Sequence, residues 1–170
     1  MASTQLTTMT KGWNIIEKTI AVILAAASLF VLYNEVSLIY SMLSSDFVIK
    51  NGTTYLELFK IHHLALIISI LGLFGGCMML FNDKKGWMFS LISLASFGIL
   101  FYISSRTNST DKALAFASFY KSYGITSIIC FALFLFLLWA PFRRKYNPTF
   151  KNWLWLIGII LLFLIDKLVV

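Results

Sequence analysis

Two acidic side chains lie within long apolar segments, where a charge is unusual. Glu35 follows Asn34 near the end of the first apolar run, and Asp166 lies near the end of the last. A charge inside a bilayer is costly unless it is paired or hydrated, so such a residue marks either an ion pair or a functional site. For Glu35 a structural ion pair, with Lys121 or Lys167 as the partner, is the simpler interpretation. Asp166, close to the C-terminus, is also able to reach water.

The adjacent pair His62-His63, at the start of the second apolar run, offers a second kind of chemistry. These are the two histidines of the chain. Neighbouring residues on a helix point about 100° apart, so the pair cannot hold one haem within a single protomer. A metal or haem shared between protomers, or a proton-sensing role, is the alternative to two polar residues at the interface. We expect no cofactor.

Other signatures of catalysis are absent from the sequence. Cys77 and Cys130 stand alone, without a Cys-x-x-Cys motif, and we expect them to be unpaired, buried and apolar in character. There is no phosphate-binding Gly loop, zinc-ligand spacing or Gly-x-Ser-x-Gly motif. The sequence therefore predicts a protein that is not an enzyme.

The composition is that of an integral membrane protein. Hydrophobic residues make up 59% of the 170 and charged residues 12%, against about 25% charged in soluble domains. The net charge is +7, but the basic residues are distributed among short loops. Because nucleic-acid binding needs basic residues on one exposed face, that function is not expected.

Five apolar runs come close to the length of about 20 residues that one crossing of the bilayer requires. We predict an all-α, polytopic bundle with helices at 13–43, 61–81, 87–105, 119–141 and 153–170. Pro141 and Pro148 lie outside the helix interiors, so no proline is expected to break a crossing. Residues 1–12 form a mobile cytoplasmic segment, and residues 13–170 form one transmembrane domain. Cleavage of the first helix as a signal peptide, which would leave four helices, is the alternative.

A Lys two residues before a Trp precedes three of the five runs. The pairs are Lys11 with Trp13, Lys85 with Trp87, and Lys151 with Trp153. Lys and Trp both favour the membrane interface, so three helices are predicted to start at one face, anchored there by these side chains. That face also carries the basic cluster Arg143-Arg144-Lys145, which predicts a cytoplasmic N-terminus and an outer C-terminus.

Two glycosylation sequons, at Asn51 and Asn108, fall in the predicted outer loops and matter only in a eukaryotic source. The second and third crossings, joined by Asn82-Asp83-Lys84-Lys85-Gly86-Trp87, resemble those of many small polytopic bacterial proteins. This generic resemblance favours a bacterial inner membrane.

Small residues predict which helices pack closest. Ala21, Ala25 and Ser28 share one stripe of the first helix, while Gly72 and Gly76 form a small-xxx-small pair on the second. Glu35 continues the stripe of the first helix, so that face is expected to point inward. The last helix consists almost entirely of large apolar residues and is expected at the periphery or against a partner.

Two functions fit these observations. The first is a non-enzymatic accessory, assembly or regulatory subunit that binds another membrane protein within the lipid bilayer. The second is a self-associating, homo-oligomeric pore or small transporter, with Glu35 near its outer mouth. Small size, few intramembrane charges and the missing catalytic motifs favour the first.

Overall fold

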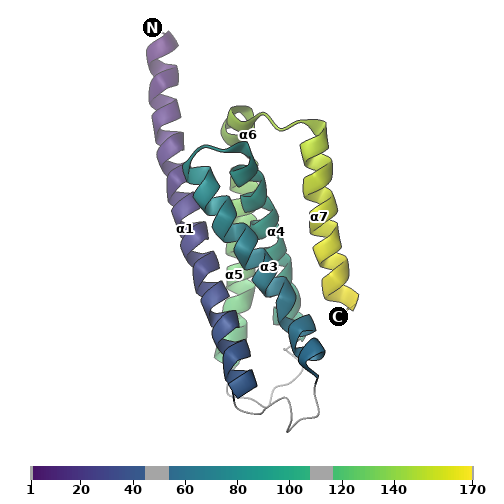
Figure 1. Ribbon diagram of the computed structural model, residues 1–170. Helices are drawn as coiled ribbons and strands as arrows, with labels where there is room; N and C mark the ends of the chain where they lie inside the picture. The colour runs from purple at the N-terminus through teal and green to yellow at the C-terminus, as the bar shows by residue number, and fades with distance from the viewer. Residues whose placement is uncertain (1, 45–53, 108–116, 170) are drawn as a thin grey trace.

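The chain folds into a bundle of antiparallel helices (Figure 1). The computed structural model describes residues 2–44, 54–107 and 117–169, and within these ranges the regular structure is entirely helical. The helices are α1 (Ala2–Ser44), α3 (Tyr55–Leu80), α4 (Lys84–Thr107), α5 (Ala117–Leu137), α6 (Ala140–Tyr146) and α7 (Phe150–Val169). The predicted all-α fold is confirmed.

The bundle has two distinct ends. The turn between α3 and α4, the short helix α6 and the start of α7 lie at one end, which we call the N-terminal end (Figure 1). The ends of α1, α4 and α7 and the starts of α3 and α5 lie at the other, the C-terminal end. As predicted, the segments that follow Lys11, Lys85 and Lys151 all begin at the same end.

Among the residues that the structure describes, three helical segments are long and apolar enough to cross a membrane: Gly12–Ser44, His62–Leu80 and Lys84–Arg106. A fourth is formed if Tyr123–Leu137 and Ala140–Tyr146 count together as one bent span. The sequence predicts five. The helix expected as the fifth crossing is present as α7. It is not among these candidate spans, because Lys151, Asp166 and Lys167 raise its content of charged residues.

Several helices extend beyond their predicted limits. α1 begins at Ala2 rather than at residue 13, so residues 2–12, predicted as a mobile segment, are drawn as helix that projects past the rest of the bundle (Figure 1). α3 begins at Tyr55 rather than at residue 61. Residues 55–60 are therefore continuous with the apolar segment that follows.

The fourth predicted helix, 119–141, is wrong at its end. α5 stops at Leu137, and α6 follows after a bend of 59°. Pro141 explains the break, because proline has no N–H and its ring clashes with the carbonyl four residues earlier, here that of Leu137. The indole N–H of Trp87 donates to this freed Leu137 carbonyl over 3.2 Å.

Small residues bring α1 and α3 into close contact, as predicted. A Cβ at Gly76 would lie 2.7 Å from the backbone oxygen of Ala21 and 2.9 Å from the Ala25 Cβ. A Cβ at Gly72 would lie 2.2 Å from the hydroxyl oxygen of Ser28. At Gly76 only glycine allows this approach, because the backbone atoms of α1 that it meets cannot rotate away.

The tryptophan of α4 does not lie at the surface. Trp87 is fully buried, stacks on Tyr146 and meets Trp153 edge to face. Its prediction as an interface anchor is wrong, because α4 is the central helix and its first turn is enclosed by α6 and α7. Trp13 and Trp153 are half-buried, and Lys85 and Lys151 are exposed; the side chain of Lys11 lies outside the described residues.

Candidate functional site

The small-residue contact between α1 and α3 places an acid opposite a histidine. Gly76 of α3 faces Ala21 of α1, and 14 residues separate each of them from the pair, from Ala21 on to Glu35 and from Gly76 back to His62, so the antiparallel helices stay in register. The Glu35 Oε2 and His62 Nδ1 atoms lie 2.7 Å apart and form a hydrogen bond. The pair is ionic when the imidazole is protonated, and it joins α1 to α3.

The second histidine engages the other predicted acid. His63 Nε2 lies 2.9 Å from Asp166 Oδ2, which joins α3 to α7. Asp166 Oδ2 has no hydrogen-bond partner among the described residues, so this contact is an ion pair only when the imidazole is protonated. His63 Nδ1 lies 2.8 Å from the Lys60 carbonyl oxygen. Both ring nitrogens of His63 thus lie close to oxygen atoms of other residues.

These two contacts correct the predicted partner of Glu35. The ion pair of Glu35 is with His62 rather than with Lys167, and the side chain of Lys121 lies outside the described residues. Asn34 is exposed on the surface of α1. His62 and His63 bind carboxylates on two different helices, which places each imidazole in a contact between helices.

A second polar cluster, at the N-terminal end, centres on a residue that the sequence analysis passes over. Glu17 is 1% exposed. Its Oε1 accepts a hydrogen bond from the Tyr146 hydroxyl, and its Oε2 lies 2.5 Å from Lys145 Nζ. Both partners belong to α6, so Glu17 fixes α6 against the side of α1. We call Glu17, Lys145, Tyr146, Asn14 and Asn82 the α6 cluster.

Lys145 uses all of its donors within the α6 cluster. Besides Glu17, its ammonium contacts Asn14 Oδ1 at 3.0 Å and Asn82 Oδ1 at 2.8 Å. An ammonium has three N–H groups, and each has one acceptor here. The three acceptors belong to α1 and to the α3–α4 turn. Lys145 therefore connects α6 to both of these segments.

Glu17 is difficult to recognise from the sequence because it lies next to Lys18, which suggests an exposed charged pair. The Lys18 ammonium instead donates to the carbonyl oxygens of Met79 and Leu80 at the end of α3. One feature of the sequence does point to Glu17. The predicted topology puts the basic cluster Arg143-Arg144-Lys145 on the same face as two acids, Glu17 and Asp83, and either could neutralise it. The carboxylate of Asp83 is engaged locally, where it accepts from the Lys85 N–H at 2.8 Å.

The two polar clusters are separated by about the thickness of a bilayer. Glu17 and Glu35 lie on one continuous helix, and a rise of 1.5 Å per residue puts them about 27 Å apart along its axis. The hydrocarbon core is about 30 Å thick. Each acid therefore lies near one boundary of the apolar layer, where charge costs less than at its centre.

The remaining candidate residues lie apart from these clusters. Cys77 and Cys130 are both free; Cys77 is exposed rather than buried as expected, and Cys130 is half-buried. Within residues 2–44, 54–107 and 117–169, no group of three His, Cys, Asp or Glu side chains comes together as a metal site. The sequons at Asn51 and Asn108 lie outside the described residues.

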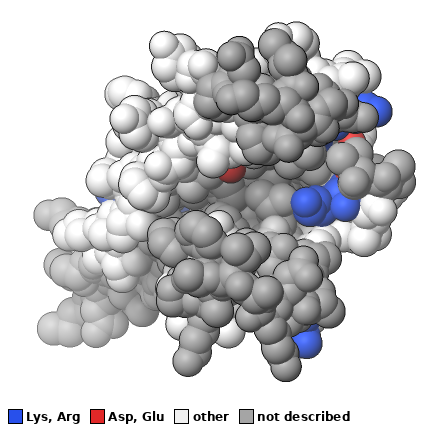
Figure 2. All heavy atoms as spheres, turned by 90° about the horizontal axis from the view of Figure 1, so that it is seen from below, with Lys and Arg blue, Asp and Glu red and all other residues white. Residues whose placement is uncertain are grey.

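The described charges on the C-terminal end are scattered. Seen from that end, Lys and Arg atoms appear at separate places around the face, and little acidic surface is visible (Figure 2). No continuous basic surface appears among the residues coloured in this view.

The fold and these clusters define a class: a membrane-associated, all-α bundle whose helices are joined by ion pairs near both ends. Comparison with protein-family models, with curated proteins and with solved structures gives no match.

Proposed function

We propose that this protein is a non-enzymatic accessory or regulatory subunit that binds another membrane protein through the outer face of α7. The proposal includes five crossings, with α7 as the fifth, a cytoplasmic N-terminus and an outer C-terminus in a bacterial inner membrane. The basic residues of α6 and the exposed Lys85 and Lys151, all at the N-terminal end, support this orientation.

The contacts at the two ends of α7 support its role as a crossing. Near its start, Trp153 meets Trp87 at the N-terminal end of the bundle, and near its end Asp166 contacts His63 at the C-terminal end. α7 therefore runs alongside α3 and α4 over the distance that separates the two polar ends. This reach supports α7 as a further crossing beside α3 and α4.

The packing of the bundle favours an interaction role over transport by a single copy. Gly72 and Gly76 close the contact of α1 with α3, and Gly75 closes that of α3 with α4. Glu35 and Asp166, the acids that a pore would need, each engage a histidine. The interior thus supports a rigid scaffold that acts through its surface.

The observation that carries the proposal is a small residue in the middle of an exposed apolar stripe on α7. Trp155, Leu162 and Ile165 are about 60% exposed and follow one another at helical spacing. Gly158 lies between them, and a Cβ built there meets nothing within 4 Å. Small residues let the backbone of a second helix approach closely in a membrane, so this stripe offers a site for a partner helix.

A glycine substitution on α7, with a matched glycine elsewhere, tests the proposal. Gly158→Leu should abolish co-purification of the partner from the native membrane while the bundle keeps its stability. Gly124→Leu is the control, because Gly124, on α5, also has open space around its Cβ position. Equal partner recovery with both variants would refute a binding role for α7.

The same preparation distinguishes the alternative function. A homo-oligomeric pore with Glu35 at its mouth would contain only copies of this chain, and Glu35→Gln would change its conductance or ion selectivity without altering assembly. If Glu35 is a structural partner of His62, Glu35→Gln lowers stability and changes little else.

A further inference from the structure

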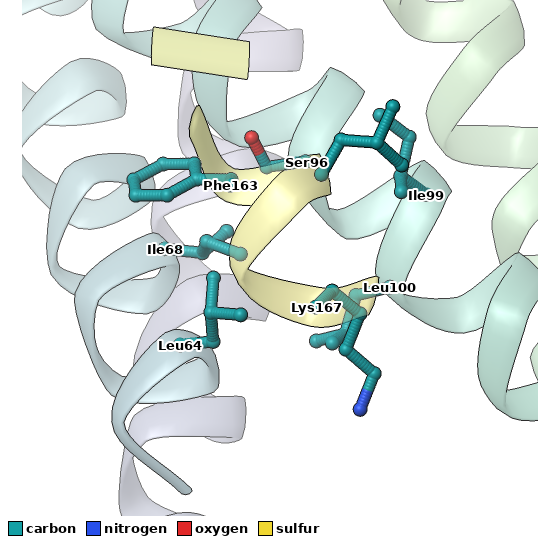
Figure 3. Close-up of a pocket in the computed structure, with 8 residues that line it drawn as sticks. Leu64, Ile68, Ser96, Ile99, Leu100, Phe163 and Lys167 are labelled. Atoms are coloured by element: carbon teal, nitrogen blue, oxygen red, sulfur yellow. The ribbon is translucent and has the colours of Figure 1, made fainter. Parts of the chain in front are cut away.

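The space between α3, α4 and α7 is too small to hold a ligand. Leu64, Ile68 and Phe163 line it, and it admits roughly one water molecule (Figure 3). Contact with another molecule is therefore expected at the surface of the bundle, where the two ends differ. The described charges at the C-terminal end are scattered, whereas basic side chains gather at the N-terminal end around α6.

Three of the basic side chains at the N-terminal end are used within the protein. The Lys18 ammonium donates to two carbonyl oxygens at the end of α3, and the Lys84 ammonium donates to the Asn147 carbonyl oxygen over 2.7 Å. Lys145 is bound within the α6 cluster. These three cations hold α1, α6 and the α3–α4 turn together.

Four other basic side chains at this end are exposed and form no ion pair with the described acids. We call them the basic face: Lys85 at the start of α4, Arg143 and Arg144 of α6, and Lys151 at the start of α7. Of the two acids at this end, Glu17 is enclosed and neutralised by Lys145. Asp83 is exposed beside Lys85, where it accepts from the Lys85 backbone N–H. The basic face therefore keeps a net positive charge.

Exposed aromatic rings neighbour the basic face along the chain. Trp139 directly precedes α6 and is 59% exposed, and Phe150 directly precedes Lys151 and is 77% exposed. The bend of 59° after α5 turns α6 away from the axis of the helix before it. Exposed rings favour the boundary between hydrocarbon and headgroups, where neighbouring Arg and Lys side chains reach the lipid phosphates. The combination is typical of a surface that lies against a membrane interface.

We propose that the basic face binds the headgroups of anionic phospholipids in the leaflet at the N-terminal end. Arg143 and Arg144 contribute most, because a guanidinium donates two hydrogen bonds to one phosphate. Lys85 and Lys151 add positive charge from α4 and α7. A group of basic residues next to a membrane helix attracts anionic over zwitterionic lipids. An acidic protein segment would match the charge of this surface but would leave the exposed rings without apolar surroundings.

Native mass spectrometry of the delipidated protein tests the basic face, with an equimolar mixture of phosphatidylglycerol and phosphatidylcholine of the same acyl chains. We expect bound phosphatidylglycerol to exceed bound phosphatidylcholine by about threefold or more. The double variant Arg143→Gln, Arg144→Gln should lose most of this preference. Its thermal unfolding temperature without lipid should stay unchanged, because neither guanidinium is paired with a described acid.

Two further double variants separate the basic face from charge in general. Arg143→Lys with Arg144→Lys keeps both positive charges and should retain most of the preference. Lys60→Gln with Lys167→Gln removes the same amount of charge from the C-terminal end and should retain the preference as well.

Four results would overturn the proposal. Equal binding of the two lipids is the first, and an equal loss of preference in the two glutamine double variants, which would reflect net charge alone, is the second. The third is release of bound phosphatidylglycerol by millimolar inorganic phosphate, which would assign the surface to free anions. The fourth is its release by a glutamate-rich peptide, which would assign the surface to an acidic protein segment. The Gly158→Leu test does not depend on the basic face, so the two proposals can fail separately.

Discussion

At the scale of single residues, three acids near the ends of the bundle each contact a basic side chain from another helix. Glu17 of α1 is held by Lys145 of α6, Glu35 of α1 by His62 of α3, and Asp166 of α7 by His63 of α3. The pairs differ in burial: Glu17 is enclosed, while the side chains of Glu35 and Asp166 are 25% and 33% exposed. Loss of its cation should therefore be most costly at Glu17.

Lys145→Met should lower the free energy of unfolding by about 1–3 kcal/mol, because it leaves the enclosed Glu17 carboxylate without its cation. The effect is smaller than for a fully buried pair, since the Lys145 side chain is about one-third exposed. Arg144→Met, one residue away on the exposed side of α6, is the control and should change the stability by less than about 0.5 kcal/mol. Denaturation in mild detergent measures both, and equal losses would contradict the assigned role of Lys145.

Trp87 provides a second prediction for a single residue. Trp87→Phe keeps an aromatic ring but removes the N–H that donates to the Leu137 carbonyl. A buried carbonyl without a donor costs about 1–3 kcal/mol, so this variant should be less stable by that amount. Trp155→Phe is the matched control because Trp155 is exposed on α7. If the two variants unfold at the same temperature, the indole N–H of Trp87 does not stabilise the Leu137 carbonyl that Pro141 leaves without a helical donor.

At the scale of helices, the packing depends on glycines whose environments differ sharply. Gly76 faces the backbone of α1, while Gly124 and Gly158 face open space. A backbone atom cannot rotate away as the end of a side chain can. The contact between α1 and α3 therefore determines both how close the two helices lie and whether Glu35 reaches His62.

Gly76→Ala should destabilise the bundle by about 1–3 kcal/mol, because the added Cβ overlaps the Ala21 carbonyl oxygen and forces α1 away. Gly158→Ala should be neutral or should stabilise by up to about 1 kcal/mol, since alanine favours the helix. Thermal unfolding of the two variants in the same detergent gives the comparison. A neutral Gly76→Ala would mean that α1 and α3 do not pack in this register.

The sequence predicts the elements better than their contacts. Apolar runs predict where the helices lie and which helix ends lie at the same end of the bundle. Small residues predict the contact of α1 with α3. The bend at Pro141 is missed because apolar character continues from Phe136 to Trp139, past the point where helical hydrogen bonding stops. The partners of Glu35 and Glu17 are missed because they depend on helix register and on how α6 folds back, and neither is encoded in local spacing.

At the scale of the whole molecule, the polar clusters lie at opposite ends of an apolar bundle, about one bilayer thickness apart. This arrangement predicts that the two termini lie on opposite sides of the membrane if α7 crosses. A reporter active only in the cytoplasm should work when fused before α1 and fail when fused after α7. Activity at both termini would mean that α7 does not complete a crossing.

Mass measurement of the intact protein, gently extracted from its own membrane, tests the proposed function most directly. It reports protein partners, copy number and bound cofactors together. The proposal of an accessory subunit predicts a stable complex with a different membrane protein, lost in Gly158→Leu and kept in Gly124→Leu. A complex made only of copies of this chain, or a bare monomer, would contradict it.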